Sequence, residues 1–455
     1  MFIAFRVFFN ARFYYPVFTV LFLDFGLSLS QFALLNAVWA ASIVLLEVPS
    51  GALADMVGRR SLLVFASSTM FVEILILCVV PRTDPWILFA AFLVNRLLSG
   101  AAEAAASGAD EALAYDSLLQ SGMAHLWPKV LVTQMRVQAA GFVVAMSIGA
   151  AVYDPALMQK LAGALGMDVA VDQAMTIRFP LYLTLAMAAG ALFATVAMRE
   201  PGPPRSHGPV EAPGQGRSVS AAISITLRAG SWIWRTPFAL VVILAGMMFD
   251  HVIRMIVTMS SQYYRIIEIP EALFGVIGSV LAMLGFFVPR LAYEMTDQRS
   301  PTFNLAALSL MTFAGLGGLT FFVPLYGLVP MVVLVAAMQM NGFFVSNYLN
   351  RITDSRRRAT VLSFKGLSFN LAYGAIGILY SLLFSTLRAA AAREGLTGAA
   401  AKELENVVFI QSVGWFPGYF FLTLAALLVF ARLRLNAETA FPTRSAAEKS
   451  RSARP

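Results

Sequence analysis

The sequence is a succession of long apolar segments separated by short polar ones. Each segment holds about 20 mostly apolar residues, which is the length an α-helix needs to cross a bilayer. In the first half we expect helices near 5–27, 31–50, 61–80, 86–106, 136–153 and 178–198. In the second half we expect them near 237–263, 272–289, 302–322, 326–350, 359–387 and 408–433. The pattern predicts an all-α membrane protein with twelve transmembrane helices in two six-helix bundles.

The polar segments divide the chain into four parts. Residues 200–216 are rich in Pro and Gly and predict a flexible linker. The residues after 436 are rich in Ala, Ser and Arg and predict a disordered tail. The expected organisation is an N-terminal bundle (1–199), a cytoplasmic linker (200–236), a C-terminal bundle (237–434) and a basic cytoplasmic tail (435–455). Within the linker, 223–234 is expected to form an amphipathic helix on the inner membrane face.

Composition supports the membrane assignment independently. The chain is 59% hydrophobic and only 13% charged, whereas a soluble globular protein is about a quarter charged. Such a chain has too few polar residues to cover its own surface, so we expect lipid to be its solvent. Its only cysteine, Cys78, rules out an intrachain disulfide. The N-terminus lacks a small-residue cleavage site, which predicts a retained first helix and not a signal peptide.

The formal net charge of +8 is distributed unevenly. If the turn near residue 58 faces the cytoplasm, 24 of the 33 Lys and Arg residues flank inner helix ends and 7 flank outer ends. The other two, Arg96 and Arg254, lie inside predicted helices. This is the bias of the positive-inside rule. The basic charge therefore indicates topology, with both termini cytoplasmic, and does not indicate a nucleic-acid partner.

Between the second and third apolar segments the chain reads Gly51-Ala-Leu-Ala-Asp-Met-Val-Gly-Arg-Arg60. This G-x-L-x-D-x-x-G-R-R pattern resembles the loop between the second and third helices of the major facilitator superfamily. Arg96–Gly100 in the fourth predicted helix is similar to the R-x-x-x-G element of that family. Three further segments resemble a bacterial drug-efflux branch of it: Leu45–Gly51, Ser107–Asp116 and Arg358–Ser363. The fifth predicted helix lacks the Gly-Pro pair found in many exporters of the family.

The resemblance implies a twelve-helix secondary transporter that works by alternating access. We expect a monomer in the plasma membrane, specifically a bacterial inner membrane. An internal repeat agrees with two related halves, because residues 53–61 align with residues 292–300 at an offset of 239. Halves related about an axis along the membrane normal are typical of this superfamily.

The resemblance also assigns roles within the motif. Gly51 and Gly58 permit tight turning and close backbone approach. Asp55 is expected to lie against the N-terminus of the eleventh helix, where unpaired N–H groups favour an anion. Such a contact would hold the two halves together on the inner side.

Two arginines complete the expected inner latch. Arg59 or Arg60 would pair with Asp55 and with an acid at the inner end of helix four, either Asp110 or Glu111. The alternative is that Arg59 and Arg60 only set the topology.

Helix four carries ionisable residues at intervals of seven. Arg96, Glu103 and Asp110 therefore share one face, because seven residues drift by only about 20° around a helix. Ionisable groups at membrane depth normally face a cavity or one another. Arg96 is the preferred cavity cation, either for an anionic substrate group or for a nearby acid that gains and loses a proton. The alternative is a structural ion pair with an acid on another helix.

Three intramembrane carboxylates are candidates for carrying a coupling proton: Asp24, Glu73 and Asp250. Desolvation of a carboxylate disfavours its charged form, which suits proton loading near neutral pH. The alternative for Asp250 is a fixed ion pair with Arg254, which lies four residues later. The alternative for Glu73 is a packing acid bonded to Ser67 or Thr69.

Helix seven carries Met247, His251, Met255 and Met259 at spacing four. Thioether and imidazole ligands suit Cu(I), so copper is one possible cargo. The alternative is that His251 is hydrogen-bonded to a neighbour and that the methionines fill helix interfaces. We predict no resident metal and no cofactor.

These observations lead to one functional hypothesis with two alternatives. The leading hypothesis is proton-coupled export of a small organic compound. The first alternative is import of a nutrient or of copper, and the second is a non-transporting membrane scaffold or sensor. The sequence shows no phosphate loop, metal-ligand cluster or nucleophile triad, so we do not expect an enzyme. The expected partners are the substrate, protons and the lipid bilayer.

Overall fold

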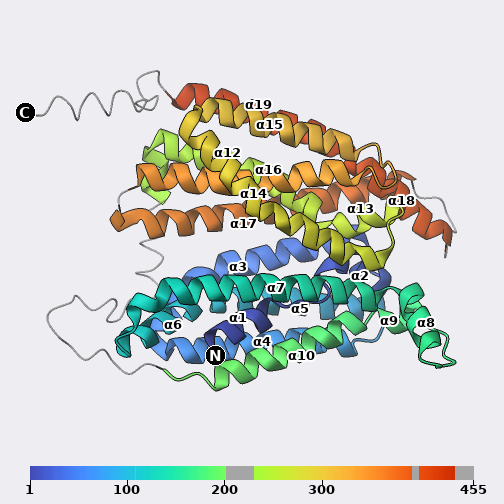
Figure 1. Ribbon diagram of the computed structural model, residues 1–455. Coiled ribbons are helices and arrows are strands. Elements are labelled where there is room, and N and C mark those ends of the chain that lie inside the picture. The colour runs from blue at the N-terminus through green and yellow to red at the C-terminus, as the bar shows by residue number, and fades with distance from the viewer. Residues whose placement is uncertain (108, 201–229, 354, 392–398, 436–455) are drawn as a thin grey trace, which may run out of the picture.

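The computed structural model describes residues 1–435 except 108, 201–229, 354 and 392–398. Every regular element within these residues is a helix (Figure 1). The expected all-α fold is therefore confirmed. Most of the predicted linker and nearly all of the predicted tail lie outside the described residues.

The first half begins with a short helix, a 3₁₀ turn and a second short helix. Its elements are α1 (Phe2–Asn10), η1 (Tyr15–Val17), α2 (Phe18–Phe25), α3 (Leu29–Val57), α4 (Arg59–Val79), α5 (Pro85–Ala106), α6 (Ala109–Gln120), η2 (Ala124–Leu126), α7 (Trp127–Tyr153), α8 (Pro155–Ala164), α9 (Gln173–Thr176) and α10 (Phe179–Val196).

The second half ends in a pair of consecutive helices. Its elements are α12 (Pro237–Thr258), α13 (Ser260–Ile266), η3 (Glu271–Leu273), α14 (Phe274–Gln298), α15 (Pro301–Leu319), α16 (Leu328–Ile352), α17 (Ser355–Ala391), α18 (Ala399–Val413) and α19 (Trp415–Arg434).

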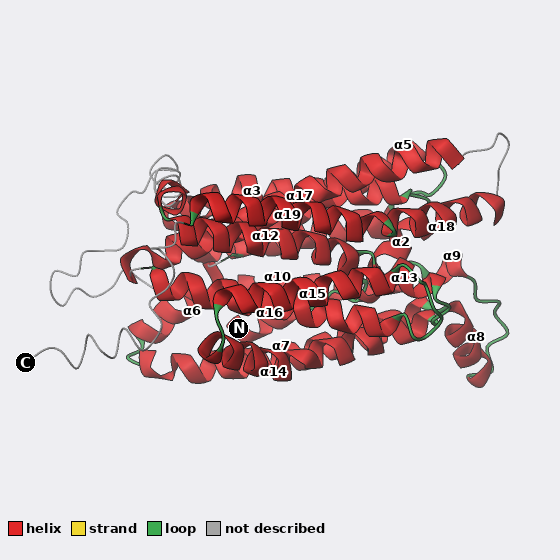
Figure 2. Cartoon of the chain, turned by 90° about the horizontal axis from the view of Figure 1, so that it is seen from above, coloured by secondary structure: helices red, strands yellow, loops and turns green. Residues whose placement is uncertain are grey.

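Figure 1 shows α1 to α10 in one bundle and α12 to α19 in another, with α3 and α17 facing each other between them. Among the described residues, eleven helical segments are long and apolar enough to cross a membrane. The remaining crossing is made by α1, η1 and α2 in succession. In Figure 2 the long helices run side by side, with α6 at one end and α8 and α9 at the other. We call the end that contains the turn at Gly58 the inner end, and the opposite end the outer end.

Two boundaries differ from the sequence-based expectation. The motif segment 51–60 was expected to form a loop, but α3 continues to Val57 and α4 begins at Arg59. The turn is the single residue Gly58, whose φ of +91° lies in a region that L side chains rarely adopt. Gly51 and Asp55 lie within the helical span of α3, and their side chains are not among those described.

The first crossing was expected to be one helix over 5–27, but it is broken between α1 and η1. At the break, the Phe13 amide donates to the Thr184 hydroxyl of α10 at 3.0 Å. Gly149 of α7 lies so close that a Cβ there would overlap the Phe13 carbonyl oxygen. The break is therefore fixed by neighbouring helices, which give its free backbone groups partners as the bilayer interior demands.

Small residues allow the two bundles to approach each other. A Cβ at Gly377 of α17 would lie 3.0 Å from the Ala33 carbonyl of α3. A Cβ at Gly275 of α14 would overlap the Met146 carbonyl of α7. Close backbone approach at small residues is a general route to packing helices in membranes. Both contacts lie near the outer ends of the helices.

Candidate substrate and proton-coupling site

A cavity of about 420 Å³ opens between the two bundles at the inner side. Its walls come from α1, α3, α5 and α6 of the first half, and Asn370 of α17 contributes from the second half. Many of its lining residues are charged or polar: Arg6, Asn10, Glu47, Glu103, Ser107, Asp110, Glu111 and Asn370. An apolar membrane interior rarely tolerates so many polar groups without a functional reason.

The outer side is closed by an ion-pair cluster that joins the two halves. Arg265 donates to Asp24 at 3.0 and 2.7 Å and to Glu271 at 2.8 and 2.5 Å. The Tyr153 hydroxyl also donates to the Asp24 carboxylate, at 2.6 Å. We call these four residues the outer latch. Because Asp24 lies in α2 and Arg265 in α13, the latch ties the first half to the second.

The arginine of the outer latch remains charged. Partial burial lowers the pKa of Arg265, but the hydrogen bond and the negative charge of Asp24 raise it above its ordinary value overall, with help from Glu271. A change of proton occupancy in the latch must therefore take place on a carboxylate.

Further hydrogen bonds seal the same end. The Thr19 amide donates to the Ser261 hydroxyl oxygen at 3.0 Å, and the Thr19 hydroxyl donates to the Thr258 carbonyl at 2.6 Å. The Ala272 amide donates to the Asp154 carboxylate at 3.1 Å. These bonds cross between the halves at the outer ends of the helices. The structure therefore has its outer side closed and its inner side open.

Arg12 occupies the break in the first crossing. Its guanidinium is 2.5 Å from Glu73, 3.4 Å from Glu103 and 3.3 Å from the Tyr14 hydroxyl. Arg12 is one of the 24 basic residues that were expected to flank inner helix ends, and for Arg12 this expectation is wrong because its side chain is 2% exposed and lies deep between α4 and α5. The signal for it was a charge inside an apolar run, followed shortly by Pro16.

The two acids beside Arg12 have different surroundings. Glu73 is fully buried, and its carboxylate also receives a hydrogen bond from Asn95 at 3.4 Å. Its partners are therefore Arg12 and Asn95, and the suggested Ser or Thr partner is wrong. Glu103, by contrast, lines the inner cavity. Of the two carboxylates, only Glu103 is open to water in this conformation.

Arg96 is buried beside the same cluster but does not touch a carboxylate among the described residues. Its Nε and Nη2 donate to the Asn95 side-chain oxygen at 3.0 and 2.9 Å. Its guanidinium also lies over the rings of Phe18 and Phe22, at 5.3 and 5.5 Å from their centroids. The structural ion pair that the sequence allowed is therefore not formed here. Cation–π contacts and one amide satisfy the charge instead.

The predicted shared face of helix four is interrupted. Arg96 and Glu103 lie on α5, but α5 ends at Ala106 and Asp110 belongs to the separate helix α6. Asp110 and the neighbouring Glu111 both pair with Arg6 of α1, at 2.6 and 2.5 Å. The three residues form a second charged group on the cavity wall.

The motif arginines have partners other than those expected. Arg59 pairs with Asp116 of α6, and Arg60 donates to the Val196 carbonyl of α10 at 2.7 Å. The predicted pairing with Asp110 or Glu111 is thus wrong in this conformation. Backbone amides of Arg59 and Arg60 also donate to the Glu200 carboxylate at 3.0 and 2.7 Å. Glu200 is therefore the anion that caps the N-terminus of α4.

The predicted pair on helix seven is present. Asp250 and Arg254 are 2.6 Å apart on α12. Arg254 also donates to the Asn370 side-chain oxygen at 3.0 Å and lies 5.3 Å from the Tyr373 ring centroid. Through Asn370, this pair reaches the wall of the inner cavity from the second half.

The Major Facilitator Superfamily model matches residues 1–377. The chain belongs to the Major Facilitator Superfamily. It is therefore a multi-pass membrane transporter, and members of this superfamily carry small-molecule substrates. No curated protein matches the sequence.

Solved structures share the fold of this superfamily member at low sequence identity. A bacterial homolog of the human lysosomal transporter Spinster, in an inward-facing and unoccupied conformation, has a TM-score of 0.67 and 14% identity, with 97% of each chain covered. The nucleoside transporter NupG has a TM-score of 0.64 and 14% identity, with 94% of this chain and 97% of that one covered. A D-xylose-proton symporter has a TM-score of 0.59 and 12% identity, with 91% and 95% covered. These likenesses show the fold and leave the branch of the superfamily open.

His251 of this superfamily member uses both ring nitrogens within the protein. Nδ1 lies 2.6 Å from the Met247 carbonyl oxygen, and Nε2 lies 2.9 Å from the Tyr419 hydroxyl. A copper ion would have to displace one of these partners. Across the described part of the chain, no three His, Cys, Asp or Glu side chains are grouped to hold a metal. The geometry therefore favours a hydrogen-bonded His251 over a copper-binding one.

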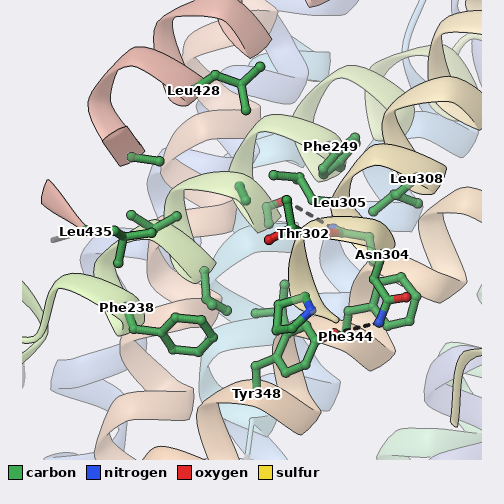
Figure 3. A pocket seen from close by; sticks show the side chains of 18 of the residues that line it. Phe238, Phe249, Thr302, Asn304, Leu305, Leu308, Phe344, Tyr348, Leu428 and Leu435 are labelled. Carbon is green, nitrogen blue, oxygen red and sulfur yellow. Dashed lines mark hydrogen bonds between the residues drawn. The ribbon is translucent and has the colours of Figure 1, made fainter. Parts of the chain in front are cut away.

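A second cavity, of about 410 Å³, lies within the C-terminal half of this transporter. Apolar side chains such as Phe238, Leu308 and Leu428 form most of its wall (Figure 3). Its buried Asn304 donates to the Tyr348 hydroxyl at 2.7 Å. Because α12, α15, α16 and α19 of one bundle supply its lining, movement between the bundles does not by itself open or close it.

Proposed function

We propose that this protein exports a small organic compound in exchange for protons, by alternating access across a bacterial inner membrane. The observation that carries the proposal is the contrast between a polar cavity open at the inner side and an ionic latch that closes the outer side. A solute from the cytoplasm would enter that cavity between the halves. Rocking of the bundles would then break the outer latch and close the inner side.

The charged residues of the site have distinct proposed roles. Glu103 and Asp250 face or reach the cavity and are proposed to take part in proton coupling, with Glu73, Arg96 and Arg254 as their charged surroundings. His251 is proposed to position Tyr419 on the neighbouring helix α19 of the same bundle.

The motif at the inner end is proposed to act in the other half of the cycle. Gly51, Asp55, Gly58, Arg59 and Arg60 would contact the second half when the inner side closes. The pairs of Asp110 and Glu111 with Arg6 would rearrange in the same movement. Asp24 is proposed to act through the outer latch.

Import is the second candidate. It is favoured by the solved structures of similar fold, which include a D-xylose-proton symporter and proton dependent oligopeptide transporters. Both candidates use a proton gradient, and they differ in whether solute moves with the proton or against it.

Inside-out vesicles separate these candidates. The lumen is acidified, and accumulation of labelled solutes from a panel of drugs, nucleosides, sugars and peptides is followed. Export by proton exchange predicts accumulation that collapses with the pH gradient and is abolished in Asp250→Asn. Glu294→Gln serves as a matched control, because Glu294 is half-exposed and its ion-pair partner among the described residues is Arg290 on its own helix. Proton-driven accumulation in right-side-out vesicles alone would instead show import, and no gradient-dependent movement of any solute would contradict both.

A further inference from the structure

We infer that the coupling proton and a positively charged group of the substrate bind in turn at the Glu103 carboxylate, so that the transported compound is an organic cation. This inference rests on the proposed proton-coupled transport and names its substrate class. It comes from the placement of Arg12 between two carboxylates that differ in access to water.

The Arg12 cluster carries an unbalanced charge. One guanidinium lies between Glu73 at 2.5 Å and Glu103 at 3.4 Å. With both acids ionised these three residues have a net charge of −1 inside the membrane region, where an uncompensated charge is costly. Adding the neighbouring Arg6 and Arg96 and the cavity carboxylates Glu47, Asp110 and Glu111 gives three guanidinium groups against five carboxylates. A single additional positive charge, from either a proton or a cation, reduces this negative excess by the same amount.

Only one of the two acids can receive that charge from the inner side. The Glu73 side chain is 0% exposed, and it holds the shorter contact with Arg12. The Glu103 side chain is 34% exposed, lies on the cavity wall and holds the longer contact. Arg12 can therefore stay with Glu73 while Glu103 exchanges its partner.

The remaining charges around the cavity favour a cation as well. Arg6 faces both Asp110 and Glu111, which again sets one guanidinium against two carboxylates. Glu47 of α3 lines the cavity, and the described residues offer it no ion-pair partner. The charged and titratable groups near Glu103, taken from each neighbouring element, are Arg6, Arg12, Tyr14, Tyr15, Glu47, Glu73, Arg96, Asp110 and Glu111.

If the proton and the cation share the Glu103 site, binding of one requires release of the other, which is exchange. In the inward-open state, the cationic group of the substrate takes the place of the proton on Glu103, and the proton leaves to the cytoplasmic water. After the bundles rock, a proton from the outside restores the neutral acid and the cation leaves. One proton then enters for each cation exported, and the cluster carries the same total charge during each crossing.

Proton release on binding tests the inference. The purified full-length protein in weak buffer receives tetraphenylphosphonium, tetraethylammonium or a protonated aromatic amine, and released protons are measured with a pH dye and by calorimetry in two buffers. The wild type is expected to release up to one proton per bound cation, with affinity that falls as the pH is lowered. Glu103→Gln is expected to release none and to show affinity that no longer depends on pH. Glu294→Gln should behave as the wild type.

Three results would overturn the inference. Proton release by Glu103→Gln equal to that of the wild type would show that the shared position lies elsewhere. Failure of every cation to bind the wild type would refute the substrate class. If Glu103→Gln does not fold, Glu103→Asp keeps the carboxylate and must retain pH-dependent binding, so loss of pH dependence in that folded variant also counts against the inference.

The same probes separate this inference from the proposed function. Cation binding with proton release but without gradient-driven accumulation in vesicles would reject export and leave the shared site standing. Gradient-driven export of a neutral solute, with no cation bound, would support the proposed export and reject the shared site.

Discussion

The two ends of the molecule use charged residues in opposite ways. At the outer end, Asp24 of the first half and Arg265 of the second half pair across the interface. At the inner end, Arg59 pairs with Asp116 and Arg6 pairs with Asp110, in each case within the first half. Both ends are rich in ion pairs, so the number of pairs does not explain which end is closed. What matters is whether a pair spans the interface.

This difference shows how charge can report conformation. An ion pair between rigid halves stabilises only the state that brings its partners together, whereas a pair within one half moves as a unit and stabilises both states alike. The outer latch should therefore control the balance between inward-open and outward-open states. The inner pairs of the first half should control the stability of that half.

The largest expected effect comes from Gly275→Ala. A Cβ at position 275 would overlap the Met146 backbone carbonyl, so α7 and α14 must separate at the outer end. We expect transport to fall by more than tenfold. We also expect cysteines introduced at the outer end to react with a thiol reagent added from outside. Gly317→Ala in the same half is the control, because nothing lies within 4 Å of its Cβ position. Normal transport by Gly275→Ala would show that close outer packing is not required.

Asp24→Asn should have the next largest effect. Breaking a buried ion pair costs about 3–5 kcal/mol. The Arg265 side chain is 30% exposed and keeps Glu271, so we expect about 1–3 kcal/mol here. That loss shifts the balance toward the outward-open state. The shift is measured by the accessibility of cysteines introduced at the outer end. The exchange Asp24→Arg with Arg265→Asp should restore part of the closure. If neither Asp24→Asn nor the exchanged pair changed this accessibility, the outer latch would not control the balance between the two states.

Glu200→Gln should have a smaller effect, on stability and not on the conformational balance. Its carboxylate caps the N-terminus of α4, and loss of such a contact costs about 1 kcal/mol at an exposed site. Because Glu200 directly follows the first half and caps a helix of that half, we expect a lower unfolding temperature with the same inward-to-outward balance. A shift in that balance would mean that this cap senses the second half.

The smallest effect is expected for Glu294→Gln in the second copy of the motif. Its pair with Arg290 spans 3.5 Å between exposed side chains on one helix. Such pairs contribute little to stability. Unfolding temperature and transport should both match the wild type, and a clear loss of either would reveal a role that the repeat shares with Asp55.

The sequence predicts the local features of this molecule well. Apolar segments of the right length give the helices, since crossing a bilayer constrains each segment separately. The Asp250–Arg254 pair follows from spacing, because residues four apart meet on one helix. The motif at residues 51–60 leads to the family without any knowledge of the packing.

Contacts between helices are a different matter. Asp24 and Arg265 are 241 residues apart, and helical periodicity does not say which faces of distant helices meet. Arg59 finds Asp116 because α5 ends and α6 begins anew, which changes the face that each later acid presents. The break at Arg12 depends on Gly149 and Thr184 in two other helices. Only the isolated charge and the nearby Pro16 hinted at it.

The most direct test of alternating access at the outer latch is a pair of spin-label distances. In a Cys78→Ala background, one pair joins exposed outer positions Trp86 and Tyr326, and another joins exposed inner positions Leu119 and Tyr293. If the outer latch controls alternating access, Asp24→Asn lengthens the outer distance and shortens the inner one in the same population. Unchanged distributions at both ends, or a change at the outer end alone, would contradict it.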